Sequence, residues 1–209
     1  MSHEALTGRQ WRFLAGLDQA DVNRFCEAVR VRELTEGQWI CRPGDPADTF
    51  YFVIDGLLSV CTESEDGRCV ATELLLPGEC GGCCCLGNRP GTTVLGARAV
   101  LASRVGLVER ARMIQMIGEM PQLVFGLLDM MQSRERKLEE KLIRVLSLPA
   151  RERVQAFFAD VGAPSLEEAA RLPLTHQDIA DLLGLTRETV SRAISELRRS
   201  ERCRSSVAS

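Results

Sequence analysis

LTHQDIADLLGLTRETVSRAISEL, from Leu174 to Leu197, is the stretch that decides the fold, because it contains two short helices whose ends can both be assigned. Thr175, followed three residues later by Asp178, forms a capping-box-like start, and Gly184 supplies the left-handed residue that ends the first helix. Thr186 then caps the second helix. Two helices joined by so tight a turn predict a helix-turn-helix, which places its second helix in the major groove of DNA.

The two faces of the second helix support this prediction. Its inner stripe and the facing partners on the first helix are apolar: Val190, Ile194 and Leu197 against Ile179, Leu182 and Leu183. The outer face offers bidentate donors for guanine, an acceptor for cytosine and hydroxyls for phosphates. The expected DNA-binding residues are Thr175, Thr186, Arg187, Glu188, Ser191, Arg192 and Ser195. The alternative is an amphipathic hairpin with a solvated polar face, which the caps and the polar face together disfavour.

Three segments resemble a known family. LPLTHQDIADLLGLTRETVSRAISEL, residues 172–197, resembles the DNA-binding domain of the cyclic-AMP receptor and fumarate-nitrate regulator (CRP/FNR) superfamily of bacterial transcription factors. EGQWICRPGDPADTFYFVIDGLLSV, residues 36–60, resembles that superfamily's β-roll sensor domain, and LPGECGG, residues 76–82, falls where its effector-binding loop begins. The resemblance runs from about Leu14 to about Arg199. It implies an α+β fold with an N-terminal β-roll (a cyclic-nucleotide-binding-like jelly roll), a long dimerisation helix and a C-terminal winged-helix-type helix-turn-helix.

The expected domains are residues 1–120 for an N-terminal helix and the β-roll sensor, 121–148 for the dimerisation helix and 149–209 for the helix-turn-helix. A short helix is predicted from Asp18, its N-cap, to Arg30. From about residue 31 to 108, β-branched and aromatic runs between turn residues predict short strands.

A heptad pattern follows Pro121. Steps of four and three residues connect Val124, Leu128, Met131, Glu135, Leu138, Leu142 and Val145, before Pro149 stops the helix. The alternative is one amphipathic helix lying on its own β-roll. The narrow seam favours a coiled coil, and the resemblance implies a parallel homodimer with Val124, Leu128, Met131, Leu138, Leu142 and Val145 at its interface.

A dimer presents two recognition helices about one DNA turn apart, so the expected partner is a double-stranded inverted repeat. In the resembling family the positions of Arg187, Glu188 and Arg192 contact bases, and Ser191 matches the fumarate-nitrate branch. A TGTGA-like and a TTGAT-like half-site both stay open. The resemblance also implies RNA polymerase as a partner. One departure is that only 12 residues follow Leu197, and ERCRSSVAS does not show the β-hairpin wing that usually ends the domain.

The composition indicates that any basic DNA-binding surface is confined to one segment of the chain. The 209 residues are 45% hydrophobic and carry a net charge of -3, so no global basic field attracts nucleic acid. Between residues 187 and 204, however, six arginines oppose three glutamates, which predicts salt-sensitive phosphate binding. No long apolar run and no signal peptide are evident, so we expect a cytoplasmic protein without a membrane partner.

The effector segment departs from the cyclic-AMP-binding members of the family. Those members supply a glutamate for the ribose and an Arg-Ser pair for the phosphate. Here Cys83 stands at the glutamate position and Thr93-Val94 near the Arg-Ser position, which argues against cyclic AMP because a buried cyclic phosphate needs a counter-cation. Arg89 would substitute only if the loop were remodelled.

Cysteines fill this segment instead. Four of the nine, Cys80, Cys83, Cys84 and Cys85, lie beside Gly81 and Gly82, and in a reducing cytosol such a cluster suggests a metal, an iron-sulfur cluster or a redox switch. In an extended segment Cys83 and Cys85 share a side, and Cys80 joins them through a C-x-x-C turn. The fourth ligand stays open among Cys26, Cys41, Cys61, Cys69 and Cys84.

An iron-sulfur cluster is the first expectation for this metal site, with haem, zinc or another soft metal, and thiol oxidation as alternatives. The chain lacks the N-terminal cysteine group of the family's four-iron oxygen sensors, and its only histidines are His3 and His176. The cysteines can also serve as apolar fillers.

The sequence therefore predicts a homodimeric, sequence-specific DNA-binding transcription regulator that responds to redox state or a diatomic gas, and not an enzyme. The alternative from a different class is a thiol-dependent redox protein. It lacks a flanking histidine base and a nucleotide-phosphate loop.

Overall fold

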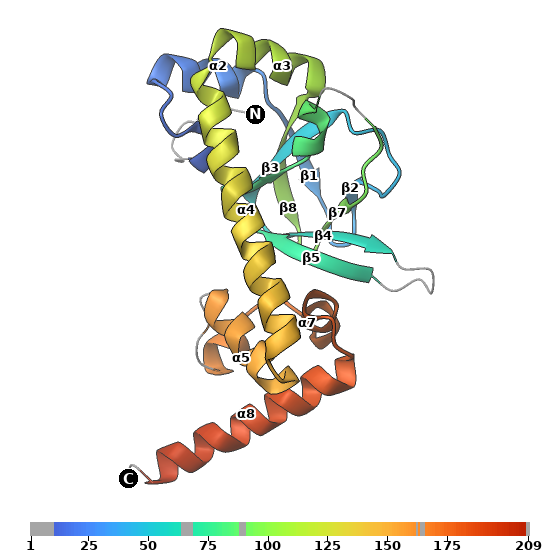
Figure 1. Cartoon of the computed structure of the whole chain (residues 1–209), viewed down its shortest axis with the longest axis vertical. Coiled ribbons are helices and arrows are strands. Elements are labelled where there is room, and N and C mark those ends of the chain that lie inside the picture. The colour runs from blue at the N-terminus through green and yellow to red at the C-terminus, as the bar shows by residue number, and fades with distance from the viewer. Residues whose placement is uncertain (1–10, 64–68, 88–90, 162, 164–165, 208–209) are drawn as a thin grey trace. The chain divides into compact units, whose positions relative to one another are not determined.

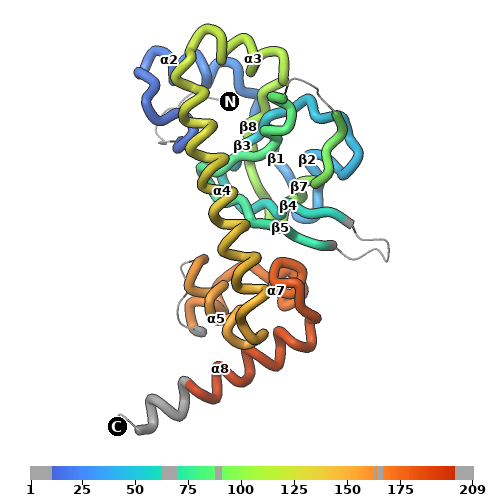
Figure 2. The backbone as a smooth tube through the Cα atoms, viewed as in Figure 1, coloured from blue at the N-terminus to red at the C-terminus, as the bar shows by residue number. Residues whose placement is uncertain are grey.

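The computed structural model of the chain describes residues 11–63, 69–87, 91–161, 163 and 166–207. Its contacts divide the chain into two compact units. The first comprises residues 1–62 and 73–137, and the second comprises residues 63–72 and 138–209. Figure 1 labels the elements, and Figure 2 traces the backbone through them.

Two antiparallel sheets form the β-roll, in agreement with the predicted run of short strands. One sheet has the order β1-β8-β3-β6 and the other β2-β7-β4-β5. The strands are β1 (Arg30–Leu34), β2 (Trp39–Cys41), β3 (Thr49–Asp55), β4 (Leu58–Glu63), β5 (Cys69–Leu75), β6 (Cys80–Gly81), β7 (Gly96–Ala99) and β8 (Ser103–Glu109).

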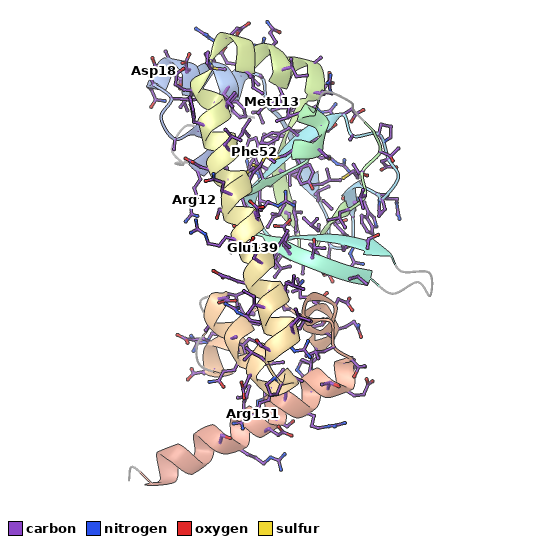
Figure 3. All side chains as sticks on the ribbon, in the orientation of Figure 1. Arg12, Asp18, Phe52, Met113, Glu139 and Arg151 are labelled. Atoms are coloured by element: carbon purple, nitrogen blue, oxygen red, sulfur yellow. The ribbon has the colours of Figure 1, made fainter. Side chains whose placement is uncertain are left out.

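Strand β3 is buried on both faces because its side chains alternate between two cores. Tyr51 and Val53 pack inside the roll with residues of both sheets, among them Leu58 and Val105. Phe50 and Phe52 point instead into a second core that the helices cover. Figure 3 labels Phe52 and Met113, which belong to this helical core.

The helices of the first unit are η1 (Arg12–Leu14), α2 (Gln19–Glu27), α3 (Arg110–Glu119) and the first part of α4 (Gln122–Ser147). Asp18 caps α2 as predicted, since its side chain accepts a 2.8 Å hydrogen bond from the amide of Asp21. Helix α2 ends at Glu27, before the predicted limit of Arg30, because Arg30 already pairs with β8. Gly126 lets α4 approach η1 closely, since a Cβ there would lie 2.2 Å from the carbonyl oxygen of Phe13.

The second unit contains α5 (Ala150–Asp160), α6 (Leu166–Ala169), α7 (His176–Leu183) and α8 (Arg187–Val207). Its core is built from helices α5, α7 and α8 through Val154, Phe158, Ile179, Ala180, Leu182, Val190, Ala193, Ile194 and Leu197. The predicted α+β architecture of β-roll, long helix and helix-turn-helix is therefore confirmed. Within the described part of the chain, no helix is long and apolar enough to span a membrane.

Candidate functional site

The turn between α7 and α8 has the predicted caps. The hydroxyl of Thr175 accepts a 3.1 Å hydrogen bond from the amide of Asp178, and the Asp178 carboxylate accepts a 2.8 Å hydrogen bond from the amide of Thr175. Gly184 ends α7 with a φ of 61°. The hydroxyl of Thr186 then accepts a 3.2 Å hydrogen bond from the amide of Thr189 and so caps α8. This local chemistry fixes the turn that orients α8.

The faces of α8 also follow the prediction. Val190, Ile194 and Leu197 are buried, whereas Arg187, Glu188, Arg192 and Ser195 are exposed. Ser191 is half-buried, and Thr175 and Thr186 are exposed beside the turn. Hydrogen bonds from its own backbone amide and from the Thr186 hydroxyl lower the pKa of the Glu188 carboxyl. Glu188 is therefore charged at neutral pH and able only to accept hydrogen bonds.

His176 is a residue of this surface that the sequence reasoning did not assign to DNA binding. Its Nδ1 atom lies 2.8 Å from the hydroxyl oxygen of Ser191, so the first residue of α7 contacts the middle of the polar face of α8. The hydroxyl of Ser195 donates a 2.8 Å hydrogen bond to the carbonyl of Ser191. His176 and Ser191 are 15 residues apart in the sequence, and no periodic pattern connects them.

Helix α4 exposes most of its predicted seam. Leu128, Met131, Leu138, Leu142 and Val145 are between 40% and 58% exposed, and Glu135 is exposed among them. Val124 is only half-buried. The face that packs on the first unit is a different one, made by Leu123, Gly126 and Leu127. Helix α4 therefore packs on the first unit by a face other than the predicted seam, and the dimer seam stays a prediction.

Phe125 and Leu146 add to the apolar exposure of α4, at 68% and 78%. Neither was assigned to the seam from the sequence. Exposed apolar side chains along a helix of 26 residues are typical of an interaction surface.

The cysteine segment is not extended, which corrects the predicted pairing of Cys83 with Cys85. Gly82 adopts a φ of 76°, and Cys83–Leu86 form a 3₁₀ helix, η2. Three residues per turn send consecutive side chains in three directions. Accordingly Cys85 is buried in the helical core, Cys83 is half-buried and Cys84 is exposed. Gly82 is required here because a Cβ would lie 2.2 Å from the carbonyl oxygen of Thr49.

The described thiols do not gather into a metal site. Among the residues that the structure describes, no three histidine, cysteine, aspartate or glutamate side chains lie close enough to hold an ion. Cys80 and Cys85 are buried in the apolar core. Burial raises the pKa of Cys83 to about 11, against the opposing effect of Arg134, and raises that of Cys85 to about 12. Such thiols stay protonated at neutral pH while no metal is bound, so a metal would have to displace their protons.

Of the candidate fourth ligands, Cys26 and Cys61 are buried and Cys41 is half-buried. The side chain of Cys69 lies outside the described residues, as does Arg89. Thr93 is buried, and its hydroxyl donates a 2.7 Å hydrogen bond to the carbonyl of Arg42, while Val94 is 81% exposed. These two residues therefore offer no cation for a phosphate.

The Tyr51 side chain lies against the two glycines of the cysteine segment, Gly81 and Gly82. A Cβ at Gly81 would lie 2.5 Å from the Tyr51 ring and hydroxyl, so the aromatic side chain fills the roll interior next to β6. Arg110 fixes the other side of the segment, because its Nε donates a 2.7 Å hydrogen bond to the carbonyl of Cys85. The backbone of the segment is thus held between β3 and α3.

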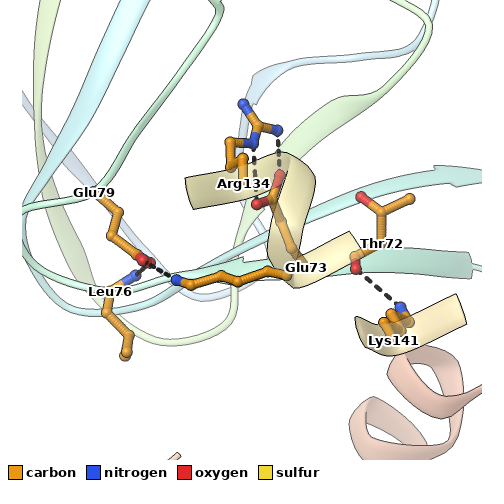
Figure 4. Close-up of polar contacts among 7 residues, drawn as sticks. Thr72, Glu73, Leu76, Glu79, Arg134 and Lys141 are labelled. Atoms are coloured by element: carbon orange, nitrogen blue, oxygen red, sulfur yellow. Dashed lines mark hydrogen bonds and ion pairs between the residues drawn. The ribbon is translucent and has the colours of Figure 1, made fainter. Parts of the chain in front are cut away.

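Two ion pairs join α4 to the strand and turn that precede this segment (Figure 4). Arg134 binds the Glu73 carboxylate through Nε at 3.0 Å and also through Nη2, and Lys137 lies 2.5 Å from Glu79. Burial raises the pKa of Glu73, which Arg134 opposes. Burial also raises the pKa of Cys83 and of Tyr51, and Arg134 opposes both shifts. The strand and turn before the cysteine segment are thus bonded directly to α4.

Comparison with known proteins agrees with both parts of the chain. Residues 31–119 match the cyclic nucleotide-binding domain, and residues 140–205 match the Crp-like helix-turn-helix domain. The nitrogen fixation regulation protein FixK of Bradyrhizobium diazoefficiens is 28% identical over 190 residues, which are 88% of this chain and 78% of that protein. The transcriptional activator protein FnrL of Cereibacter sphaeroides is 30% identical over 179 residues, covering 80% of this chain and 70% of FnrL.

The structure of FixK2 from Bradyrhizobium japonicum superposes with a TM-score of 0.70 at 29% identity, covering 83% of this chain and 86% of FixK2. These relatives are transcription regulators, not enzymes. The two matched domains, the helix-turn-helix caps and the relatives lead to one conclusion: the chain belongs to the CRP/FNR family of DNA-binding transcription regulators.

Proposed function

We propose that this regulator acts as a homodimer that binds an inverted-repeat DNA site and changes its affinity with the redox state of its cysteine segment. The observation that carries the DNA-binding part is the exposed polar face of α8 behind a correctly capped turn. Glu188, Ser191 and Arg192 are the base-reading residues of this proposal. RNA polymerase is the expected protein partner at a promoter, and such a function places the protein in the cytoplasm.

The exposed seam of α4 supports the homodimer. A second copy of α4 would cover Leu128, Met131, Leu138, Leu142 and Val145 and so remove apolar surface from water. A twofold axis along the seam presents the same α8 face twice, which matches the symmetry of an inverted repeat.

The signal enters through the cysteine segment in this proposal, but the donors among the described residues do not fit a metal centre. The absence of a clustered donor set among the described residues disfavours an iron-sulfur cluster, zinc or haem, and leaves thiol oxidation as the favoured chemistry. Cys84 is the exposed thiol of the segment. Hydrogen peroxide would convert it to a sulfenic acid and water, and condensation with a second thiol would release a second water and form a disulfide.

Selection from random duplex DNA tests the DNA-binding part. It should return a pseudo-palindrome, and Arg192→Ala should weaken binding to that site by about 1–3 kcal/mol through loss of a bidentate base contact. An unchanged affinity of Arg192→Ala for the selected site would remove Arg192 from the base-reading set. Recovery of no enriched sequence would contradict the proposal itself.

DNA affinity measured before and after peroxide treatment tests the sensing part. Wild type should differ about 5- to 150-fold between the two states, the usual range of allosteric coupling, and Cys84→Ser should lose the difference. Cys26→Ala removes a buried thiol of α2 and serves as the control that keeps the response. Visible absorption of protein purified without oxygen would instead assign the signal to a cluster, or to haem if a Soret band is present.

A further inference from the structure

The polar face of α8 continues beyond the residues proposed to read bases. Glu188, Arg192, Ser195 and Arg199 follow one another at steps of four, three and four residues, so they lie on one stripe of the helix. Arg198 lies at the edge of the same face. Arg198 and Arg199 are both exposed, and the buried Leu197 lies on the opposite side.

The two arginines belong to a well-anchored turn. Arg151 of α5, labelled in Figure 3, donates a 2.8 Å hydrogen bond to the hydroxyl of Ser200. The Ser200 hydroxyl in turn donates a 3.0 Å hydrogen bond to the carbonyl of Glu196. These bonds hold α8 against α5 at Ser200, the residue after Arg199. The packed helix therefore fixes the direction in which the Arg198 and Arg199 side chains leave its surface.

Their distance from the base-reading residues decides what they can reach. Arg199 is seven residues beyond Arg192 and eleven beyond Glu188. At about 1.5 Å per residue these separations are about 10 Å and about 16 Å along the helix axis. The major groove is about 12 Å wide, so a side chain this far along the stripe faces the sugar-phosphate wall when Glu188 and Arg192 face base edges.

The same region departs from the resembling domains. Helix α8 continues as a helix to Val207, and no strand follows it among the described residues. The turn of α8 that bears Arg198 and Arg199 is a cationic part of the helix beyond the base-reading residues.

We propose that Arg198 and Arg199 bind the DNA phosphate backbone at the edge of the groove read by Glu188 and Arg192. The proposal rests on the proposed function, since it requires α8 to enter the major groove. Arginine suits this role because its planar guanidinium gives two parallel hydrogen bonds to a phosphate.

The salt dependence of binding tests the proposal. On the DNA site returned by selection, and on an unrelated duplex, Arg199→Ala and Arg198→Ala should each lower the slope of log K against log salt. The expected decrease is about 0.9 per lost phosphate contact, or about 1.8 for a dimer. The base preference should stay that of wild type. Arg199→Lys should keep most of the slope because lysine still binds a phosphate as a point charge.

Two comparison variants separate this role from the others. Arg192→Ala should change base preference, whereas Arg136→Ala, which removes an exposed arginine of α4, should change neither preference nor slope. Wild-type slope and affinity in the Arg198→Ala/Arg199→Ala double variant would overturn the inference while leaving DNA binding intact. A shift in base preference with Arg199→Ala would also overturn it, because Arg199 would then be a base reader. A wild type that binds no duplex would overturn both the inference and the proposed function.

Discussion

At the scale of single residues, the helix-turn-helix is specified by a few side chains whose roles are local. Thr175, Asp178, Gly184 and Thr186 bond to backbone groups within four residues of themselves or take a left-handed φ, and such features can be predicted from sequence. The contact of His176 with Ser191 could not be predicted in this way. It depends on how α7 crosses α8, which the packing of Ile179 and Val190 in the core decides.

This contact predicts that His176 positions the Ser191 hydroxyl for DNA. His176→Ala should weaken specific binding by about 0.5–1.5 kcal/mol, the net value of one hydrogen bond, with little change on unrelated DNA. His176→Asn should recover part of the loss, because the Asn side-chain amide can bond at the Nδ1 position. Fluorescence anisotropy on the selected site and on an unrelated duplex measures both. If His176→Ala caused the same loss of binding free energy in Ser191→Ala protein as in wild type, the two side chains would act independently.

At the scale of elements, the periodic segments were predictable and the aperiodic ones were not. The heptad steps of α4 and the turn-punctuated strands of the roll carry their own signals, so their existence was anticipated. The 3₁₀ helix at Cys83–Leu86 carries no such signal. Its conformation follows from the left-handed Gly82 and the close approach of Thr49, which are tertiary effects. In this conformation Cys83 and Cys85 no longer share a side, as they would in an extended segment.

The packing of α4 on the first unit depends on Gly126 and can be tested there. Gly126→Val would place side-chain atoms against the carbonyl of Phe13, only 2.2 Å from the ideal Cβ, and helix and backbone would have to separate. We expect a loss of about 1–3 kcal/mol in the free energy of unfolding, typical of overpacking. Thermal and urea denaturation measure it. Gly118→Val on α3 is the matched control, because nothing lies within 4 Å of a Cβ at Gly118. Equal losses in the two variants would show that the close approach of Phe13 is not the cause, because helix propensity alone favours valine over glycine.

At the scale of the whole molecule, the function requires surfaces that one chain leaves uncovered. The seam of α4 is apolar yet exposed, and Arg134 on the same helix bonds to Glu73 and acts on Cys83. One helix therefore bears both the proposed dimer seam and the contact with the strand and turn before the cysteine segment. In the proposed dimer, a redox change that displaced Arg134 would act on the helix that pairs the two subunits, and an allosteric coupling of about 1–3 kcal/mol would be sufficient for a switch.

Leu138→Arg tests whether the seam joins two subunits. Leu138 is 43% exposed in the single chain, so the substitution leaves the cores of the monomer intact, but in a dimer it places two arginines across the seam. We expect sedimentation to show a shift toward monomer and specific DNA affinity to fall steeply, because one recognition helix contacts only half of the inverted repeat. Circular dichroism should show unchanged secondary structure. Glu135→Arg changes charge on the same exposed stretch without removing an apolar contact and should have the smaller effect. A Leu138→Arg protein that remains a dimer with wild-type affinity would place the subunit contact elsewhere, with Phe125 and Leu146 as the next exposed apolar side chains to substitute.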